Sequence, residues 1–415
     1  MNLVLIKSLL SVLLVLTAGV ILWKKEYLTQ RLKDQRVTRM LALGWLLFRV
    51  VPFLLVYVAA GFAPTSDVNG FWDEGSKASM GQVVYRDFWS PYSPFFAYFL
   101  GIWLKIWYDP RMIVLTMTVM DALALWATWH LYRSRMSAAD FLYKALLYYV
   151  LPGSLILCVV GAQEDVWMWL LVVAAYLFRQ RTGRVEVYAA ILAIGLLLTK
   201  AIFILILVPL FFLEKEKIRF TVIMVAIGAL TLAILYPLVG MEFMQPLDEA
   251  DTLRAPNLLS VLNPLFFNSI GVGQKFWNWA GLVVSVGLGS WTAWRLRTAD
   301  FSEMISRTWV TLYATMMVVQ QSAYSNYIFL FLIPLLFVVI DWRNRTQVGL
   351  LLVFNILCVV HPSYWWRLGM PKYLTPADIV ASGAAILDYL MQVAIVALTI
   401  YFVRLAGIFS KNQHI

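Results

Sequence analysis

The residues best suited to chemistry lie between Asp67 and Asp109, in a polar stretch bounded by two apolar runs. This stretch carries four carboxylates and two cations close together: Asp67, Asp73, Glu74, Asp87, Lys77 and Arg86. Carboxylates and cations gathered in this way can take up a proton and stabilise developing negative charge in a group-transfer reaction. Where most of a chain is apolar, one long polar loop is the first place to look for such groups.

Asp67 is the candidate general base. It stands at the end of an apolar run, where a desolvated membrane surface raises the basicity of a carboxylate. The alternative is a solvated loop acid or a helix cap. Asp73 and Glu74 follow at the start of a short amphipathic helix, and we assign them a secondary catalytic role, in binding the acceptor or a metal. Their alternative role is to stabilise the first turn of that helix.

Cations that could bind an anionic group are spread over the loops on the same predicted side of the membrane. They are Arg86, Lys200, Arg254, Lys275, Arg367 and Lys372. Lys200 is the strongest of these candidates because it interrupts an apolar run, where a cation needs a partner, a water-filled cavity or a route to the interface. Simple snorkelling of its side chain to the interface is the alternative.

A second group of polar residues could line a pocket for a ligand. It comprises Gln163, Glu164, Asp165, Tyr85, Tyr92, Tyr327 and His361. Interhelical hydrogen bonding is the alternative for the residues within apolar segments. The three histidines are scattered and the two cysteines, Cys158 and Cys358, lie in apolar runs, so no metal site is predicted. A divalent cation such as Mg²⁺ or Mn²⁺ is left open.

The composition excludes an ordinary soluble domain. Of 415 residues, 62% are hydrophobic and 13% charged, against about half and about a quarter in soluble proteins. Runs of about 20 apolar residues recur along the chain, as spanning helices require. The net charge of +10 arises from Lys and Arg clusters between apolar runs, which the positive-inside rule explains. We therefore expect membrane lipids as partners and no nucleic acid.

These clusters predict an all-α protein with about 13 membrane helices, in which the long 63–110 loop faces away from the cytoplasm and carries helices at the membrane surface. The segment 94–108 is too short to cross, so a surface helix is expected there. We divide the chain into an extra N-terminal helix and basic cytoplasmic loop (1–39), a core with the active-site loop (40–213), and C-terminal membrane helices (214–415) with outer loops 238–275 and 361–378. Arg49 and Asp121 fall mid-span, and we expect them to pair, because either charge alone would be costly.

The 63–110 loop resembles the first extracytoplasmic loop of the glycosyltransferase-C superfamily, whose members take sugars from polyprenyl-phosphate carriers. The matching pattern is Asp67, Phe71, a turn from Gly81 to Phe88 and a Pro-containing aromatic helix from Ser90 to Phe96. Gly161–Asp165 is similar to the acidic second-loop motif, and Leu198–Lys200 to the lysine between two short helices. The chain departs from some relatives in having Ser90 and Tyr92 where they carry a lysine beside the proline pair.

This resemblance implies a bundle like that of the superfamily and an inverting transfer of a mannose-like hexose. The donor would be a polyprenyl-phosphate sugar, and the acceptor a hydroxyl on a glycan, lipid or protein. The six cations given above would then hold the lipid-linked phosphate, and the second polar group would bind the acceptor or the sugar. A prokaryotic plasma membrane is favoured over the endoplasmic reticulum. The alternatives are a transporter or lipid flippase, which would show inverted repeats or matching broken helices, and a non-catalytic assembly subunit.

Overall fold

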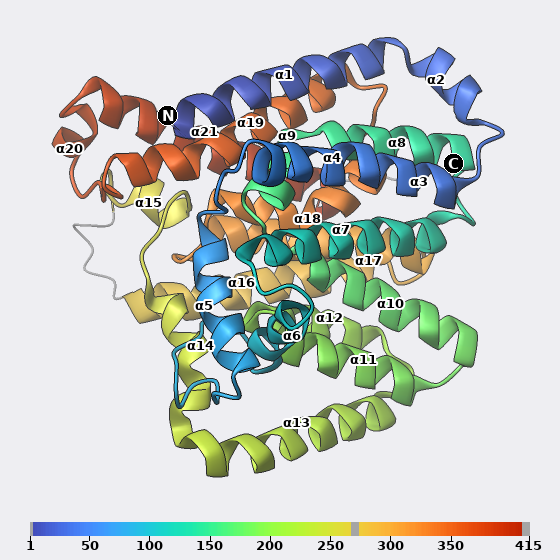
Figure 1. Ribbon diagram of the computed structural model, residues 1–415, viewed down its shortest axis with the longest axis vertical. Coiled ribbons are helices and arrows are strands. Elements are labelled where there is room, and N and C mark those ends of the chain that lie inside the picture. The colour runs from blue at the N-terminus through green and yellow to red at the C-terminus, as the bar shows by residue number, and fades with distance from the viewer. Residues whose placement is uncertain (1–2, 267–273, 409–415) are drawn as a thin grey trace. The chain divides into compact units, whose positions relative to one another are not determined.

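The protein is an all-α, multi-pass membrane protein. The computed structural model describes residues 3–266 and 274–408, and within them the β pairing consists of one isolated bridge, between Val84 and Phe88 (Figure 1). A segment exposed to lipid must satisfy its backbone hydrogen bonds internally, because the hydrocarbon offers no partners, and an α-helix does so. Among the described residues, six helices are long and apolar enough to cross a membrane: Leu3–Trp23, Val37–Ala59, Pro110–Tyr132, Lys217–Asp248, Arg345–Arg367 and Gly383–Gly407.

By its contacts the chain forms two compact units, and each is described by itself. The N-terminal unit comprises residues 21–150 and 154–249. Its helices are α2 (Lys25–Leu32), α3 (Val37–Trp45), α4 (Val51–Phe53), α5 (Asp67–Ser79), α6 (Phe95–Leu104), α7 (Pro110–Tyr132), α8 (Ala138–Val150), α10 (Val166–Thr182), α11 (Val185–Leu198), α12 (Ile204–Leu213), α13 (Lys217–Val239) and α14 (Gln245–Asp248). Segments of π-helix cover Leu46–Val50, Leu54–Ala59 and Ile156–Val160, and 3-10 turns cover Ala201–Phe203 and Gly240–Met244.

The C-terminal unit comprises residues 1–20, 151–153 and 250–415. It holds most of α1 (Leu3–Trp23), then α15 (Leu258–Leu262), α16 (Gln274–Arg295), α17 (Phe301–Val319), α18 (Ile328–Pro334), α19 (Arg345–Arg367), α20 (Pro376–Val380) and α21 (Gly383–Val403). Its π-helical segments are Leu335–Val339 and Arg404–Ile408, with a 3-10 turn at Ser325–Tyr327. The short helix α9 (Pro152–Leu155) and the 3-10 turn Glu249–Asp251 lie at the boundary of the two units. Part of the expected outer loop 238–275, residues 267–273, lies outside the described residues.

Helices form at the apolar runs of the sequence, with two departures from straight spans. The apolar run at residues 145–161 does not form one straight span: it is divided between two segments, Ala138–Val150 and Pro152–Val160, bent by 70°. Pro152 explains the break, because its ring displaces a backbone carbonyl and its nitrogen donates no hydrogen bond. The expected surface helix is α6, which has ten residues. Ten residues rise about 15 Å, half of the hydrocarbon thickness of a bilayer.

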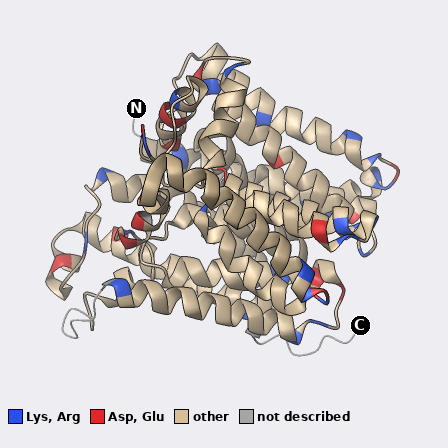
Figure 2. Ribbon diagram, turned by 90° about the horizontal axis from the view of Figure 1, so that it is seen from below, with Lys and Arg blue, Asp and Glu red and all other residues tan. Residues whose placement is uncertain are grey.

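Charged residues lie mostly at helix ends and in connecting loops, and the middles of the helices are largely uncharged (Figure 2). Arg49 and Asp121 are an exception that the sequence analysis expected. Both side chains are fully buried, and Nε of Arg49 lies 2.9 Å from Oδ2 of Asp121. The guanidinium also donates to the Tyr149 carbonyl and the Ser154 hydroxyl. The predicted intramembrane pair is thus confirmed, with hydrogen-bond partners that offset its desolvation.

Two glycines let α5 and α6 pack closely. A Cβ at Gly101 would lie 3.0 Å from the Ser79 nitrogen and 3.1 Å from the Gly75 carbonyl oxygen, both backbone atoms that cannot move aside. Aromatic rings fill the rest of the contact, with Phe71 of α5 meeting Phe96 of α6 edge-on at 5.3 Å. This packing fixes the helix that carries Asp67 against the aromatic helix that follows the loop.

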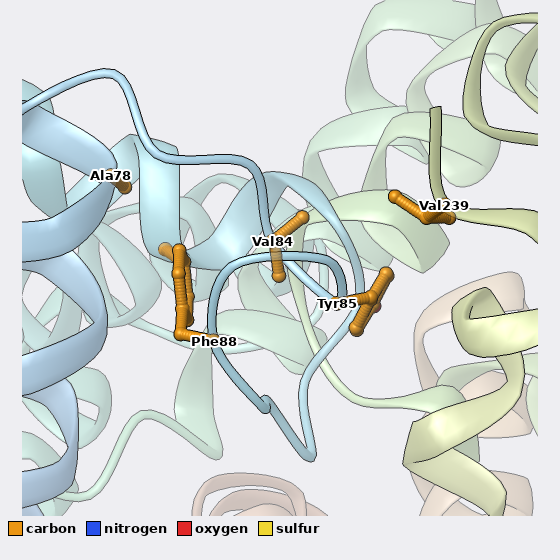
Figure 3. Packing of buried hydrophobic residues seen from close by; sticks show 6 residues of the cluster. Ala78, Val84, Tyr85, Phe88 and Val239 are labelled. Carbon is orange, nitrogen blue, oxygen red and sulfur yellow. The ribbon is translucent and has the colours of Figure 1, made fainter. Parts of the chain in front are cut away.

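The connection between α5 and α6 is held by an apolar cluster. It contains Ala78, Val84, Tyr85, Phe88, Ala97 and Val239. In Figure 3 Phe88 lies on the side of the loop that faces Ala78, and Tyr85 lies on the side that faces Val239, at the end of α13. Gln245 of α14 donates to the Tyr85 carbonyl at 3.1 Å. The polar stretch is therefore an ordered loop anchored by the end of a distant helix.

Candidate active site

Asp67 is the first residue of α5, and its carboxylate is exposed but oriented. Nε2 of Gln163 donates to Oδ2 of Asp67 at 2.5 Å, and the same nitrogen lies 3.2 Å from the Gly161 carbonyl oxygen. Residues 67 and 163 come from separate segments of the N-terminal unit, so only the fold brings them together. The exposed face of the Asp67 carboxylate is left accessible to a substrate hydroxyl.

The backbone is strained immediately before both of these residues. Ser66 has φ 64° and Ala162 has φ 47°. A left-handed backbone is uncommon for non-glycine residues and costs about 1–3 kcal/mol where the surroundings impose it. Tyr85 in the neighbouring loop is a third such residue, with φ 70°. Three of the four positive-φ non-glycine positions in the described chain therefore flank the candidate residues, a concentration that is typical of functional sites.

Lys200 forms a buried ionic cluster with two carboxylates. Its Nζ lies 2.7 Å from Oε1 of Glu164 and 2.7 Å from Oδ1 of Asp165, whose side chains are 2% and 0% exposed. Burial raises the pKa of both carboxyls, and the Lys200 ammonium opposes that rise. Within the described residues, no hydrogen-bond donor reaches Oε2 of Glu164 or Oδ2 of Asp165. These oxygens are acceptors that a substrate hydroxyl could satisfy.

Tyr92 lies beside the cluster. Lys200 Nζ is 5.7 Å from the centroid of its ring, which stacks on Phe96 at 4.2 Å. Burial raises the pKa of the Tyr92 hydroxyl well above its ordinary value, and four carboxylates add to the rise: Glu164, Asp67, Glu74 and Asp165. Those four side chains thus lie within electrostatic reach of one phenol. Ser93 also donates its backbone N–H to the Thr199 carbonyl at 3.0 Å, which ties the loop to the Lys200 segment.

Glu74 is buried beneath the loop. The Ser90 hydroxyl donates to its Oε2 at 2.7 Å, and Ser90 is fully buried. Burial raises the pKa of Glu74 to about 8, and the charges of Asp73 and Glu164 act in the same direction, while the Ser90 hydrogen bond lowers it. Glu74 is therefore mostly protonated at neutral pH, and is a hydrogen-bonding group of the loop and not a second base.

Other sequence candidates in this unit lie away from the cluster. Asp73 forms an exposed pair with Lys77 at 2.6 Å, on the outer face of α5. Arg86 is exposed and paired with Asp87 at 2.8 Å. Tyr85 is buried and donates its hydroxyl to the Tyr92 carbonyl, so it supports the loop.

The remaining candidates belong to the C-terminal unit. They are Arg254, Lys275, Arg367, Lys372, Tyr327 and His361. Arg254 and Lys372 line one cavity of this unit, whereas Lys275 and Arg367 do not. His361 is buried in α19, where Nε2 lies 3.3 Å from Oδ1 of Asp388.

Sequence reasoning did not identify Asp388. Its Oδ2 accepts hydrogen bonds from the Tyr373 hydroxyl at 3.0 Å and from Gln392 Nε2 at 2.7 Å. The signal was present, because Asp388 is an acid within the apolar run that forms α21, and ionisable residues in such runs are rare.

Within residues 3–266 and 274–408, no group of three His, Cys, Asp or Glu side chains is close enough to ligate one ion. Comparison with known proteins adds no assignment to this site. No family model matches the sequence, and no curated protein matches it.

Proposed function

We propose that this protein is an inverting membrane glycosyltransferase of the glycosyltransferase-C type. It would move a hexose, mannose-like by the sequence resemblance, from a polyprenyl-phosphate carrier to a hydroxyl of a glycan, lipid or protein. The observation that carries the proposal is the oriented, exposed carboxylate of Asp67 beside the buried Lys200–Glu164–Asp165 cluster. These residues come from three segments, and each segment holds one part of the sequence motif.

In this proposal Asp67 is the general base. Its free carboxylate face takes the proton of the acceptor hydroxyl, and the Gln163 hydrogen bond holds the carboxylate in one orientation. The acceptor oxygen then forms a bond to the anomeric carbon while the bond from that carbon to the phosphate oxygen breaks. The polyprenyl phosphate leaves with the electron pair, and attack opposite to the leaving group inverts the anomeric centre.

The two buried carboxylates change the role expected for Lys200. Glu164 and Asp165 both contact its ammonium group, so its charge is already offset. We therefore assign Lys200 to positioning: it holds two acceptor oxygens beside Tyr92, where sugar or acceptor hydroxyls would donate to them. Arg86 lies in the middle of the loop between α5 and α6, where it is exposed and paired with Asp87. Its accessibility favours it over the buried Lys200 cluster for contact with a carrier phosphate.

The proposal also includes the topology: about 13 membrane helices, α6 at the surface, and the loop on the extracytoplasmic side of a prokaryotic plasma membrane. Cysteine labelling tests this orientation with little background, because both native cysteines are buried. Asn69→Cys in α5 should react with an impermeant maleimide on intact cells. Lys33→Cys should react only after permeabilisation. The reverse pattern would remove the basis for the assignment.

The direct test of the reaction is a transfer assay. The purified full chain in nanodiscs is incubated with a panel of radiolabelled polyprenyl-phosphate hexoses and with candidate hydroxyl acceptors. We expect label to pass to an acceptor from one donor, with release of polyprenyl phosphate. Movement of a glycolipid between leaflets without bond cleavage would instead favour the flippase alternative.

A further inference from the structure

A small cavity in the C-terminal unit combines aromatic walls with buried amide groups. Its volume is about 210 Å³, and residues of α15, α16, α19 and α21 line it. Two aromatic side chains of the lining, Trp365 and Tyr373, are buried. The indole N–H of Trp365 donates to the Pro371 carbonyl at 3.1 Å, so this side chain offers the cavity carbon surface. Apolar walls with a few placed polar groups are typical of small-molecule sites.

The buried Asp388 carboxyl determines how the Gln392 amide is oriented. Its Oδ2 accepts from the Tyr373 hydroxyl at 3.0 Å and from Nε2 of Gln392 at 2.7 Å, while Nε2 of His361 lies 3.3 Å from its Oδ1. Burial raises the pKa of the Tyr373 hydroxyl above its ordinary value and the nearby Asp388 carboxyl adds to the rise, so this phenol keeps its proton and donates. Because Oδ2 is an acceptor, Gln392 presents its NH₂ group to it, and the amide oxygen is left for another partner.

Gln392 therefore holds a buried acceptor for a ligand. Its side chain is fully buried and lines the cavity, and no hydrogen-bond donor among the described residues reaches its Oε1. Asn257, another buried amide of the lining, is satisfied within the fold: Oδ1 accepts from the Ser260 N–H at 2.9 Å, and Nδ2 donates to the Gln321 carbonyl at 3.1 Å. Since buried polar atoms in proteins almost always have a partner, an O–H group in the cavity is expected to donate to Gln392.

We infer that this cavity binds a hydroxylated small molecule such as a monosaccharide. One ligand hydroxyl donates to Oε1 of Gln392, and the C–H face of the sugar ring lies against the wall formed by Trp365 and Tyr373. The wall is held before binding, since the Tyr389 hydroxyl donates to the Val261 carbonyl at 2.7 Å and so joins α21 to α15. Such prior ordering reduces the entropy lost on binding. A free sugar and the headgroup of a glycolipid share this chemistry.

The test is ligand binding to the full-length protein in nanodiscs. The soluble probes are radiolabelled methyl glucoside, mannoside and galactoside, measured at equilibrium. The lipid probe is a photoreactive monohexosyl diacylglycerol in the nanodisc, measured by saturable cross-linking. We expect at least one probe to bind, and tetrahydropyran, the same ring without hydroxyls, should not compete. Binding of a methyl hexoside assigns the site to a free sugar, and binding of the lipid probe alone assigns it to a glycolipid headgroup.

Two variants connect binding to the cavity. Gln392→Leu removes the acceptor and should weaken binding on the order of tenfold, the loss expected for one buried hydrogen bond. Leu374→Trp places a larger ring at an exposed position of the lining and should weaken binding on the order of tenfold or more by occupying ligand space. Its matched control is Val380→Trp, at an exposed residue of the same unit that does not line the cavity, and this variant should bind like the wild type.

The exposed position of Leu374 keeps the test decisive even if Gln392→Leu fails to fold. Absence of binding for every probe would overturn the inference, and so would wild-type affinity in Leu374→Trp. A sugar bound at the Asp67 site instead would give this second result, because variants of the cavity would not change its affinity. The inference stands apart from the proposed transfer reaction, since the cavity belongs to the C-terminal unit and its binding assay needs neither acceptor nor turnover.

Discussion

Gln163 donates a hydrogen bond from Nε2 to Oδ2 of Asp67 at 2.5 Å, across 96 residues of sequence. The bond orients the carboxylate that we propose as the base. Replacing Gln163 with Ala should lower kcat by on the order of tenfold to a hundredfold, because misplacement of a reacting group is costly. Steady-state kinetics of the transfer reaction would measure it. The control is Asn69→Ala, at an exposed residue of α5, the helix that begins at Asp67; its kcat should match that of the wild type. Equal kcat for the wild type and both variants would contradict the orienting role.

Variants of Lys200 distinguish a role in positioning Glu164 and Asp165 for the reaction from a role in stabilising the fold alone. Lys200→Met leaves Glu164 and Asp165 buried without their cation, and should destabilise the protein by about 3–5 kcal/mol. The triple variant with Glu164→Gln and Asp165→Asn removes the uncompensated charge, so its thermal midpoint in detergent should recover. Its turnover should remain low. Recovery of both stability and turnover would mean that the cluster only supports the fold.

The buried carboxyl of Glu74 predicts a pH dependence of stability. Because its pKa is raised to about 8 in the folded state from an ordinary value of 4.5, the folded protein binds a proton more tightly than the unfolded chain. The resulting stabilisation is complete below about pH 4.5 and is lost as the pH rises through about 8. Thermal midpoints across this range should show the decline, and Glu74→Gln should flatten it. An identical slope in the variant would assign the decline to other groups.

The Arg49–Asp121 pair predicts a double-mutant rescue. Asp121→Leu leaves a buried guanidinium unpaired and should cost about 3–5 kcal/mol, seen as lost expression and a lower thermal midpoint. Arg49→Met with Asp121→Leu replaces both charges by apolar groups and should restore much of the loss. No rescue in the double variant would show that Arg49 is held mainly by its bonds to Tyr149 and Ser154.

The sequence predicted this pair because both charges fall in the middle of apolar runs, where each needs a partner. It also predicted an all-α membrane protein, because a spanning helix is formed by consecutive apolar residues. Six helices of the described residues have the required length and composition, and the count of about 13 stays a prediction. The break at Pro152 was missed, although proline marks it, because the flanking runs together have the length of a single span.

The site was predicted in pieces. Asp67, Lys200, Glu164 and Asp165 were each named as candidates, but the sequence did not indicate that Lys200 pairs with the two acids. Their pairing depends on how α10 and α11 place residues 164, 165 and 200, and no local pattern encodes that. The positive φ angles of Ser66 and Ala162 could not be predicted from the sequence either. A left-handed backbone is usually marked by glycine, and neither position is a glycine.

The most direct measurement is the turnover of Asp67→Asn with the donor identified in the panel assay. The substitution keeps the shape and an acceptor oxygen for Gln163 but removes the base. We predict that kcat falls about 10²- to 10⁴-fold, with the thermal midpoint and donor affinity unchanged. An Asp67→Asn protein that transfers the sugar at the wild-type rate would contradict the account.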